Sequence, residues 1–119
     1  MDKGNLAEKF DLFQEHWSPK IVAELNGQYV KLAKLQGEFV WHRHEAEDEM
    51  FLVVKGRLVI KLREDDVVLE EGEFLVVPRG MEHCPAAEEE AHVLLFEPQS
   101  TAHTGDVHSE RTVTALDWI

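Results

Sequence analysis

Cysteines, basic residues and long apolar runs are all scarce in this sequence. Cys84 is the only cysteine, so no disulfide can form within the chain, and we expect a reducing, cytoplasmic location. The polar opening residues lack the apolar core that a signal peptide needs. The longest apolar run, residues 50–54, is far shorter than the ~20 residues that span a bilayer. These absences predict a soluble protein.

Positive charge is also in short supply. The chain has 12 Lys and Arg against 24 Asp and Glu, and its net charge is −12. The basic residues are scattered singly along the sequence and form no basic cluster. We therefore expect neither nucleic acid nor an anionic membrane as a partner. The 119 residues, 44% of them hydrophobic, suffice for one folded domain over residues 1–119.

The first 19 residues carry a helical pattern. Four large apolar residues recur at spacings of four, three and four: Leu6, Phe10, Phe13 and Trp17. Asn5 and Glu8 resemble a capping box at its start, and Ser18 before Pro19 ends it. A short amphipathic N-terminal helix is therefore predicted within residues 1–19.

From residue 20 to about residue 98 the pattern changes to short β-rich runs. Asn26-Gly27 is a strong hairpin signal between residues 21–25 and 28–35. Seven more runs follow, over residues 39–43, 49–54, 57–62, 67–69, 74–77, 81–84 and 92–96. Glu88, Glu89 and Glu90 read as a solvated hairpin tip before the last run. Closely spaced strands without intervening helices indicate an all-β antiparallel sandwich or small barrel.

Residues 99–119 are predicted to form a C-terminal arm. The arm begins polar, yet it closes on Leu116, Trp118 and Ile119, which need a surface to cover. The runs 74–77 and 93–96 are apolar on both faces, as expected where one face lines a barrel and the other is covered. The cover is the arm or a second subunit, so we expect a homodimer, with the arm on its own barrel or on its partner's.

Two motifs carry the residues with metal-binding chemistry. The first, G-x4-H-x-H-x4-E-x6-G, runs from Gly37 to Gly56. Residues two apart in a strand share a face, so His42 and His44 project together, and a turn can return Glu49 on the neighbouring strand. The second motif, G-x5-P-x-G-x2-H, spans residues 72–83 and adds another imidazole.

Together these motifs resemble the two signatures of the cupin superfamily, and the resemblance covers residues 37–83. Within that superfamily, the sequence is similar to small single-domain cupins related to phosphomannose isomerase. The resemblance implies a double-stranded β-helix, the cupin jelly-roll barrel, over about residues 20–98. It also implies four metal ligands: His42, His44, Glu49 and His83. Among the nearby acidic residues Glu45, Glu47, Asp48 and Glu49, only Glu49 has the family's gaps to both His44 and Gly56.

This sequence departs from the family pattern at two positions. The spacer between Gly37 and His42 is one residue short, which a strand lead-in tolerates. Ala87 replaces the final asparagine of the second signature, so no role of that side chain carries over. Neither departure touches a ligand.

Strand alternation predicts the surroundings of these ligands. Four apolar residues share their face and should line the pocket: Val40, Phe51, Val53 and Met81. By the same alternation Phe39 and Trp41 should lie on the opposite face, and Cys84 should be a small buried hydrophobe.

Three imidazoles and one carboxylate suit a divalent first-row transition metal, here Fe, Mn, Ni or Zn. Four protein ligands on an octahedral ion leave two positions for water, O₂ or a chelating ligand. The expected function is to hold a small oxygenated metabolite at this metal, with catalysis of the dioxygenase or sugar-isomerase type. A non-enzymatic module that binds or senses a metal or small ligand is the alternative. The sequence identifies no catalytic residue apart from the metal ligands.

Overall fold

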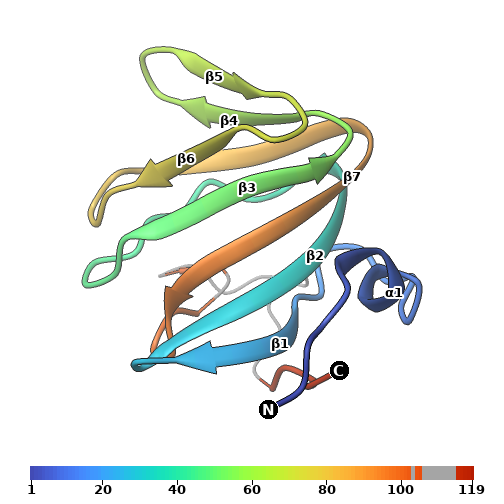
Figure 1. Ribbon diagram of the computed structural model, residues 1–119. Helices are drawn as coiled ribbons and strands as arrows, with labels where there is room; N and C mark the ends of the chain where they lie inside the picture. Colours follow the sequence, from blue (N-terminus) through green and yellow to red (C-terminus); the bar gives the residue numbers. More distant parts are fainter. Residues whose placement is uncertain (103, 106–114) are drawn as a thin grey trace.

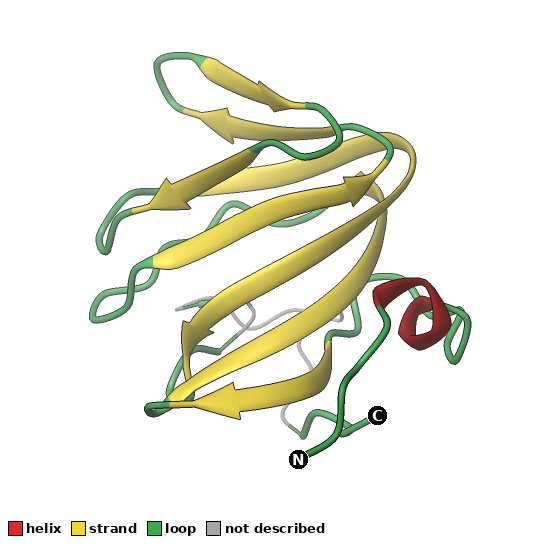
Figure 2. Cartoon of the chain, viewed as in Figure 1, coloured by secondary structure: helices red, strands yellow, loops and turns green. Residues whose placement is uncertain are grey.

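The structure is a computed structural model that describes residues 1–102, 104–105 and 115–119. One short helix precedes a set of strands (Figures 1 and 2). The elements are α1 (Leu6–Phe10), β1 (Lys20–Leu25), β2 (Gln28–Glu38), β3 (Glu49–Lys55), β4 (Leu58–Leu62), β5 (Asp66–Leu69), β6 (Phe74–Val77) and β7 (His83–Pro98). All named strand pairs are antiparallel. The all-β prediction is confirmed.

The last strand, β7, holds the sheet together. The main path runs β1-β2-β7-β3-β6, while β4 pairs with both β5 and β7. β7 is 16 residues long, so its second half pairs with β2 and β3 and its first half with β2 and β4. This shared strand curls the sheet around a common interior, as the long diagonal ribbon in Figure 1 shows.

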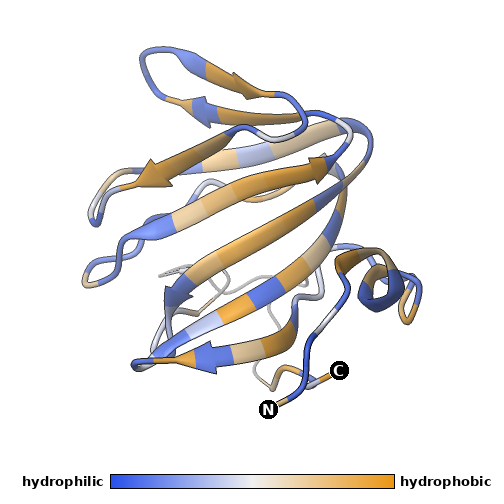
Figure 3. Cartoon of the chain, viewed as in Figure 1, coloured by the Kyte–Doolittle hydropathy of each residue, from blue (hydrophilic) through white to orange (hydrophobic). Residues whose placement is uncertain are grey.

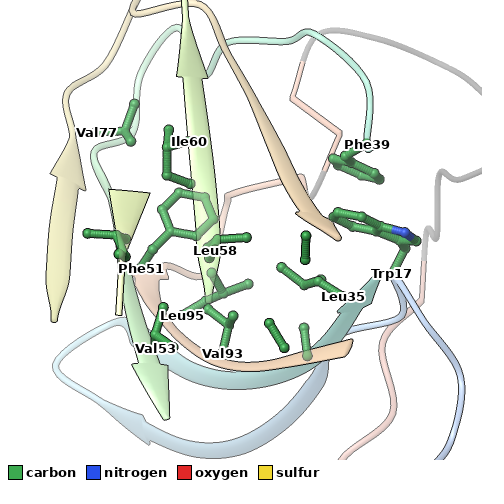
Figure 4. Close-up of a cluster of buried hydrophobic side chains, with 14 residues drawn as sticks. Trp17, Leu35, Phe39, Phe51, Val53, Leu58, Ile60, Val77, Val93 and Leu95 are labelled. Carbon is green, nitrogen blue, oxygen red and sulfur yellow. The ribbon is translucent and has the colours of Figure 1, made fainter. Parts of the chain in front are cut away.

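The interior follows from alternation along the strands. In β3 the residues Phe51 and Val53 point inward, and their neighbours are only partly buried. Their side chains meet Leu58, Ile60 and others from the facing strands in one apolar cluster (Figure 4). Because this cluster contains no charged group, it provides a core that is independent of the histidines.

A second, smaller cluster lies on the outer side of the sheet. Phe10 and Phe13 cover Leu32 of β2, and the terminal residue Ile119 packs against them. Ile119 also donates its backbone N–H to the carbonyl of Ile21, at 3.0 Å. Residues 115–119 thus dock on β1 of their own barrel. Residues 106–114 of the predicted arm lie outside the described part of the chain.

Three predicted elements differ from the observed ones. The helix is shorter than its apolar pattern, since α1 ends at Phe10 and Trp17 has a φ of 58°. Residues 39–43 are not a strand, because β2 ends at Glu38. The second half of the run 81–84 and the whole run 92–96 belong to one strand, β7, which begins at His83, so the prediction of a hairpin tip between them was wrong. Residues 88–90 are exposed beside a bulge in the β2–β7 ladder, which solvates the three glutamates without a turn.

No helix among the described residues has the length and apolar character needed to cross a membrane.

Candidate metal centre

The two sequence motifs meet at one end of the barrel. His42 and His44 lie in the loop between β2 and β3, Glu49 begins β3, and His83 begins β7. His42 and His83 form an isolated antiparallel bridge, with backbone N···O distances of 3.0 and 2.9 Å. The Gly80 N–H donates to the carbonyl of His44 at 2.8 Å. Backbone hydrogen bonds therefore join the loop of the first motif to the turn of the second.

The four side chains predicted as ligands come together. One ligand atom from each of His42, His44, Glu49 and His83 lies within 4.8 Å of all the others. Each of these residues is at most 4% exposed. Glu49 Oε1 is 3.3 Å from His44 Nε2 and 3.5 Å from His83 Nε2. Two donors about 2.1 Å from one ion and at right angles to each other lie about 3 Å apart, so the spacing fits a shared ion.

The same atoms lack other partners. His44 Nε2, His83 Nε2 and Glu49 Oε1 are buried and make no hydrogen bond. A buried polar group without a partner costs about 1–3 kcal/mol. A cation contacting all three would satisfy them at once, and a set of three nitrogens and one oxygen is typical of first-row transition metals.

Backbone carbonyls orient two of the imidazoles. Nδ1 of His42 lies 2.9 Å from the carbonyl of Val40, and Nδ1 of His83 lies 2.9 Å from that of Met81. Since a carbonyl only accepts, each Nδ1 carries the proton and donates it. The lone pair of Nε2 is then left for the centre of the cluster, as in protein metal sites.

Burial keeps the His42 imidazole neutral. Burial, followed by the neighbouring His83, lowers the pKa of His42 from 6.5 to about 4, although the carbonyl of Val40 and the Glu49 carboxylate act in the opposite direction. Burial by itself raises the pKa of Glu49, but the neighbouring Glu97, His44 and His83 side chains bring the pKa well below its usual value. A neutral imidazole beside an ionised carboxylate is the state that binds a metal ion.

The metal-free protein should therefore lose stability in acid. The folded-state pKa of His42 is below the unfolded value of 6.5, so between pH 6.5 and about 4 only the unfolded chain takes up this proton. The free energy of unfolding then falls as the pH falls through this window, by up to about 3 kcal/mol from His42. Urea unfolding of wild type and of His42→Gln at pH 7 and pH 4.5 isolates the effect. Equal losses in the two proteins would contradict it.

Two aromatic residues close the apolar side of the site. Phe39 is 8% exposed and meets the His42 ring edge-on, with centroids 5.5 Å apart. Trp17 stacks on Phe39 at 4.5 Å, as Figure 4 shows. The expected opposite placement of Phe39 does not hold, because the chain has left β2 there and strand alternation no longer applies. The Trp41 ring has a different contact. It lies beneath the Arg63 guanidinium, whose Cζ is 3.8 Å from the centroid of the Trp41 ring.

A small cavity of about 30 Å³ adjoins the histidines. Its lining is His42, Glu49 and eight apolar residues: Trp17, Pro19, Ala33, Leu35, Phe39, Phe51, Pro85 and Leu95. Of the expected pocket residues, Phe51 lines this cavity, Val53 is buried in the core, and Val40 packs against the core. Met81 is 42% exposed.

The C-terminal segment covers another side of the ligand loop. Thr104 is 1% exposed, and Gly105, with a φ of 60°, lies against the loop backbone. A Cβ on Gly105 would overlap the Arg43 carbonyl oxygen and come within 3.0 Å of the His42 ring. Only glycine fits this approach without a shift of the loop.

One pair near the site was missed by the sequence reasoning. Lys31 Nζ and Glu97 Oε1 are 2.9 Å apart inside the barrel, with side chains 1% and 0% exposed. Burial, followed by the nearby Glu49 carboxylate, raises the pKa of Glu97 well above its usual value, while Lys31 opposes the rise. The available signal was alternation, because Glu97 shares the inward face of Val93 and Leu95.

Comparison with known proteins gives a consistent result. Residues 28–97 match the Cupin domain family, Cupin_2. A cupin-2 domain containing protein from Shewanella frigidimarina NCIMB 400 is 46% identical, with 80% of this chain and 93% of that chain covered and a TM-score of 0.79. Protein NMB1881 from Neisseria meningitidis is 28% identical, with 82% and 100% covered and a TM-score of 0.76.

A curated relative is matched over a shorter stretch. The uncharacterized protein YdbB of Bacillus subtilis (strain 168) is 36% identical over 63 residues, which are 52% of this chain and 56% of that protein. The chain thus spans about half the length of this curated relative. The matched family, the antiparallel sheet and the His/His/Glu/His cluster agree, and this chain belongs to the cupin family.

Proposed function

We propose that this cupin binds one divalent transition metal ion through His42, His44, Glu49 and His83, and holds a small oxygenated ligand at that ion. The observation that supports the proposal is the group of buried donor atoms without partners, His44 Nε2, His83 Nε2 and Glu49 Oε1, facing one another. Fe, Mn, Ni and Zn all suit this donor set. When bound, such an ion supplies Lewis acidity and open coordination positions.

The chain limits which ligand can approach. The cavity beside His42 has about 30 Å³, and a water molecule needs roughly 10–15 Å³ by this measure, so about two waters fit. A divalent ion with one carboxylate and neutral imidazoles has a charge of about +1, which favours an oxygen-rich or anionic ligand. We therefore propose an oxygen-rich or anionic ligand that places only a few atoms on the His42 side of the ion.

Turnover, if this protein is an enzyme, would take place at the metal. Apart from the ligands His42 and Glu49, the cavity lining is apolar, so it offers no second acid–base pair. We propose chemistry of the dioxygenase or sugar-isomerase type. A binding or sensing module without turnover is the second candidate, and the absence of a further acid–base pair in the lining of this cavity favours it.

Metal uptake tests the proposal. The protein is purified without chelators, loaded separately with Mn, Fe, Ni or Zn under reducing conditions, and freed of excess metal. We expect about one ion per chain by elemental analysis. If the protein takes up none of these four metals, the proposed metal site is wrong. An oxygen-consumption screen of the iron-loaded protein with small oxygenated acids then separates an oxygenase from the binding module.

We also propose a homodimer, formed by the outer face of β3, β6 and β7. Two cross-strand rows of apolar residues lie there by register: Val76, Met50 and Phe96, and Phe74, Leu52 and Leu94. Phe74 is 65% and Val76 is 50% exposed. Figure 3 shows these strands as largely hydrophobic, and α1 covers only the part of this face near Leu32. Burial of roughly 1,600 Å² of such surface sustains a standard interface.

A charged substitution on this face tests the proposed dimer. Phe74→Asp is expected to convert the dimer into a monomer, because it buries an unpaired carboxylate at each symmetric contact. Light scattering at micromolar concentration should change from twice the 13.7 kDa chain mass to the chain mass itself. Val68→Asp, at an exposed position on β5, is the control and should remain dimeric. A wild type that is monomeric under these conditions would overturn the dimer.

A further inference from the structure

Three charged side chains lie side by side inside the barrel, on neighbouring strands. Lys31 belongs to β2, Glu97 to β7 and Glu49 to β3, and these strands are adjacent in the order β2-β7-β3. The β3–β7 register pairs Met50 with Phe96, which places Glu49 beside Glu97. Glu49 and Glu97 are thus cross-strand neighbours whose carboxyl groups act on each other, and Lys31 Nζ is 2.9 Å from Glu97 Oε1.

These charges do not serve the packing of the barrel. The other inward-facing residues of this part of β7, Val93 and Leu95, are apolar and buried. Burying a charged group costs several kcal/mol, and a buried ion pair returns this only with good geometry and further hydrogen bonds. A hydrophobic pair of similar volume would fill the same space at no such cost. The Lys31–Glu97 pair therefore calls for a role besides stability.

The contacts of the pair point to Glu49. Both carboxyl oxygens of Glu97 are buried and have no hydrogen-bond partner among the described residues. The groups that act on this carboxyl are the Lys31 ammonium, which forms an ion pair with it, and the Glu49 carboxyl group. Beyond Glu97, the Lys31 ammonium reaches the Thr101 carbonyl at 3.5 Å and the Tyr29 ring at 5.8 Å. Lys31 is thus held from several sides, and it in turn fixes the position of Glu97.

We propose that Glu97 and Lys31 are positioning residues for the metal ligand Glu49. Glu97 holds the Glu49 carboxylate so that Oε1 faces His44 and His83, and Lys31 holds Glu97 in place. This inference rests on the proposed metal site and adds to it the pair of residues that sets its affinity. In protein metal sites, loss of such a supporting contact costs 10–100-fold in metal affinity.

The test compares two double variants that both remove the buried charges. Lys31→Met with Glu97→Gln (the Met/Gln protein) keeps a polar side chain that can donate to Glu49. Lys31→Met with Glu97→Met (the Met/Met protein) keeps the volume and removes every polar group that this pair places beside Glu49. Replacing both partners of a buried ion pair by neutral residues of similar volume often leaves the free energy of unfolding unchanged or higher. Both proteins are therefore expected to fold. Circular dichroism and thermal unfolding check this before metal is added.

Two readouts report on Glu49 itself: competition with a chromophoric chelator for Zn²⁺ or Mn²⁺, and the visible d–d absorption of the Co²⁺-loaded protein. The Met/Met protein should bind about 10–100-fold more weakly than wild type, with an altered Co²⁺ spectrum. The Met/Gln protein should stay within about threefold, with the wild-type spectrum. Val93→Ala, a buried truncation on the same strand, is the control for general loosening and should leave the spectrum unchanged.

The outcomes separate this inference from the metal site. A wild type that takes up no metal overturns both. If wild type binds metal and the Met/Met protein matches it in affinity and spectrum, the metal site stands and the positioning role is wrong. If Val93→Ala loses as much affinity as the Met/Met protein, the effect is general loosening, and the positioning role is again wrong.

Discussion

His83→Ala is expected to abolish stoichiometric metal binding while the barrel stays folded. His83 offers one of the four proposed ligand atoms, and its Nε2 is 3.5 Å from Glu49 Oε1 at the centre of the cluster. Removing a ligand has a larger effect than the 10–100-fold that supporting contacts supply. The fold should survive because the apolar cluster around Val53, Leu58 and Ile60 does not depend on the histidines. His44→Ala is expected to behave in the same way.

Elemental analysis after metal loading measures the loss, and circular dichroism checks the fold. His16→Ala is the matched control, since His16 is exposed and pairs with Glu90 away from the cluster, and it should keep about one ion per chain. If His83→Ala binds the ion with wild-type affinity, the ion sits elsewhere, among the many acidic side chains.

Trp17→Ala is expected to lower the free energy of unfolding by about 3–5 kcal/mol, the usual cost of truncating a large buried aromatic. Trp17 is 6% exposed, stacks on Phe39 and donates from Nε1 to the Gln36 carbonyl at 2.9 Å. The substitution removes all three contributions and enlarges the cavity beside His42. A loss of this size is a large fraction of the total stability of a small domain.

Urea unfolding of the metal-free proteins measures this loss. Trp41→Ala is the control, because Trp41 is only half-buried beneath Arg63 and should cost much less. Trp17→Phe should lie between wild type and Trp17→Ala, since it retains a ring against Phe39 but loses the hydrogen bond. Equal losses for Trp17→Ala and Trp41→Ala would show that the aromatic stack contributes little.

The convergence of the four candidate ligands was predictable from sequence because their spacing is largely local. His42 and His44 are two residues apart, Glu49 follows after a short loop, and the turn after β6 delivers His83. The alternation of β3 likewise predicted that Phe51 and Val53 are buried. These features depend on neighbours along the chain, which a single sequence displays.

The surroundings of the site were not predictable in the same way. Phe39 and Trp17 lie in irregular segments beyond the ends of β2 and α1, where the strand and helix periodicities expected for them do not apply. The Lys31–Glu97 pair depends on the β2–β7 register, which brings together two residues more than 60 positions apart in the sequence. Charged residues at inward positions could have been noticed from alternation, but their partner across the sheet could not. Likewise, the three glutamates in β7 resembled a turn because the sequence does not show a ladder bulge.

The central position of β7 has a consequence for how the protein is made. Translation produces this strand after the other named strands, and β2, β3 and β4 all pair with it. A nascent chain that ends before residue 83 would leave edges of these three strands open, and such long-range pairing forms slowly. His83 arrives on the same strand, so the full ligand set and the closed sheet become available together. Metal should therefore enter a chain that has already completed its barrel, rather than act as a nucleus around which the barrel folds.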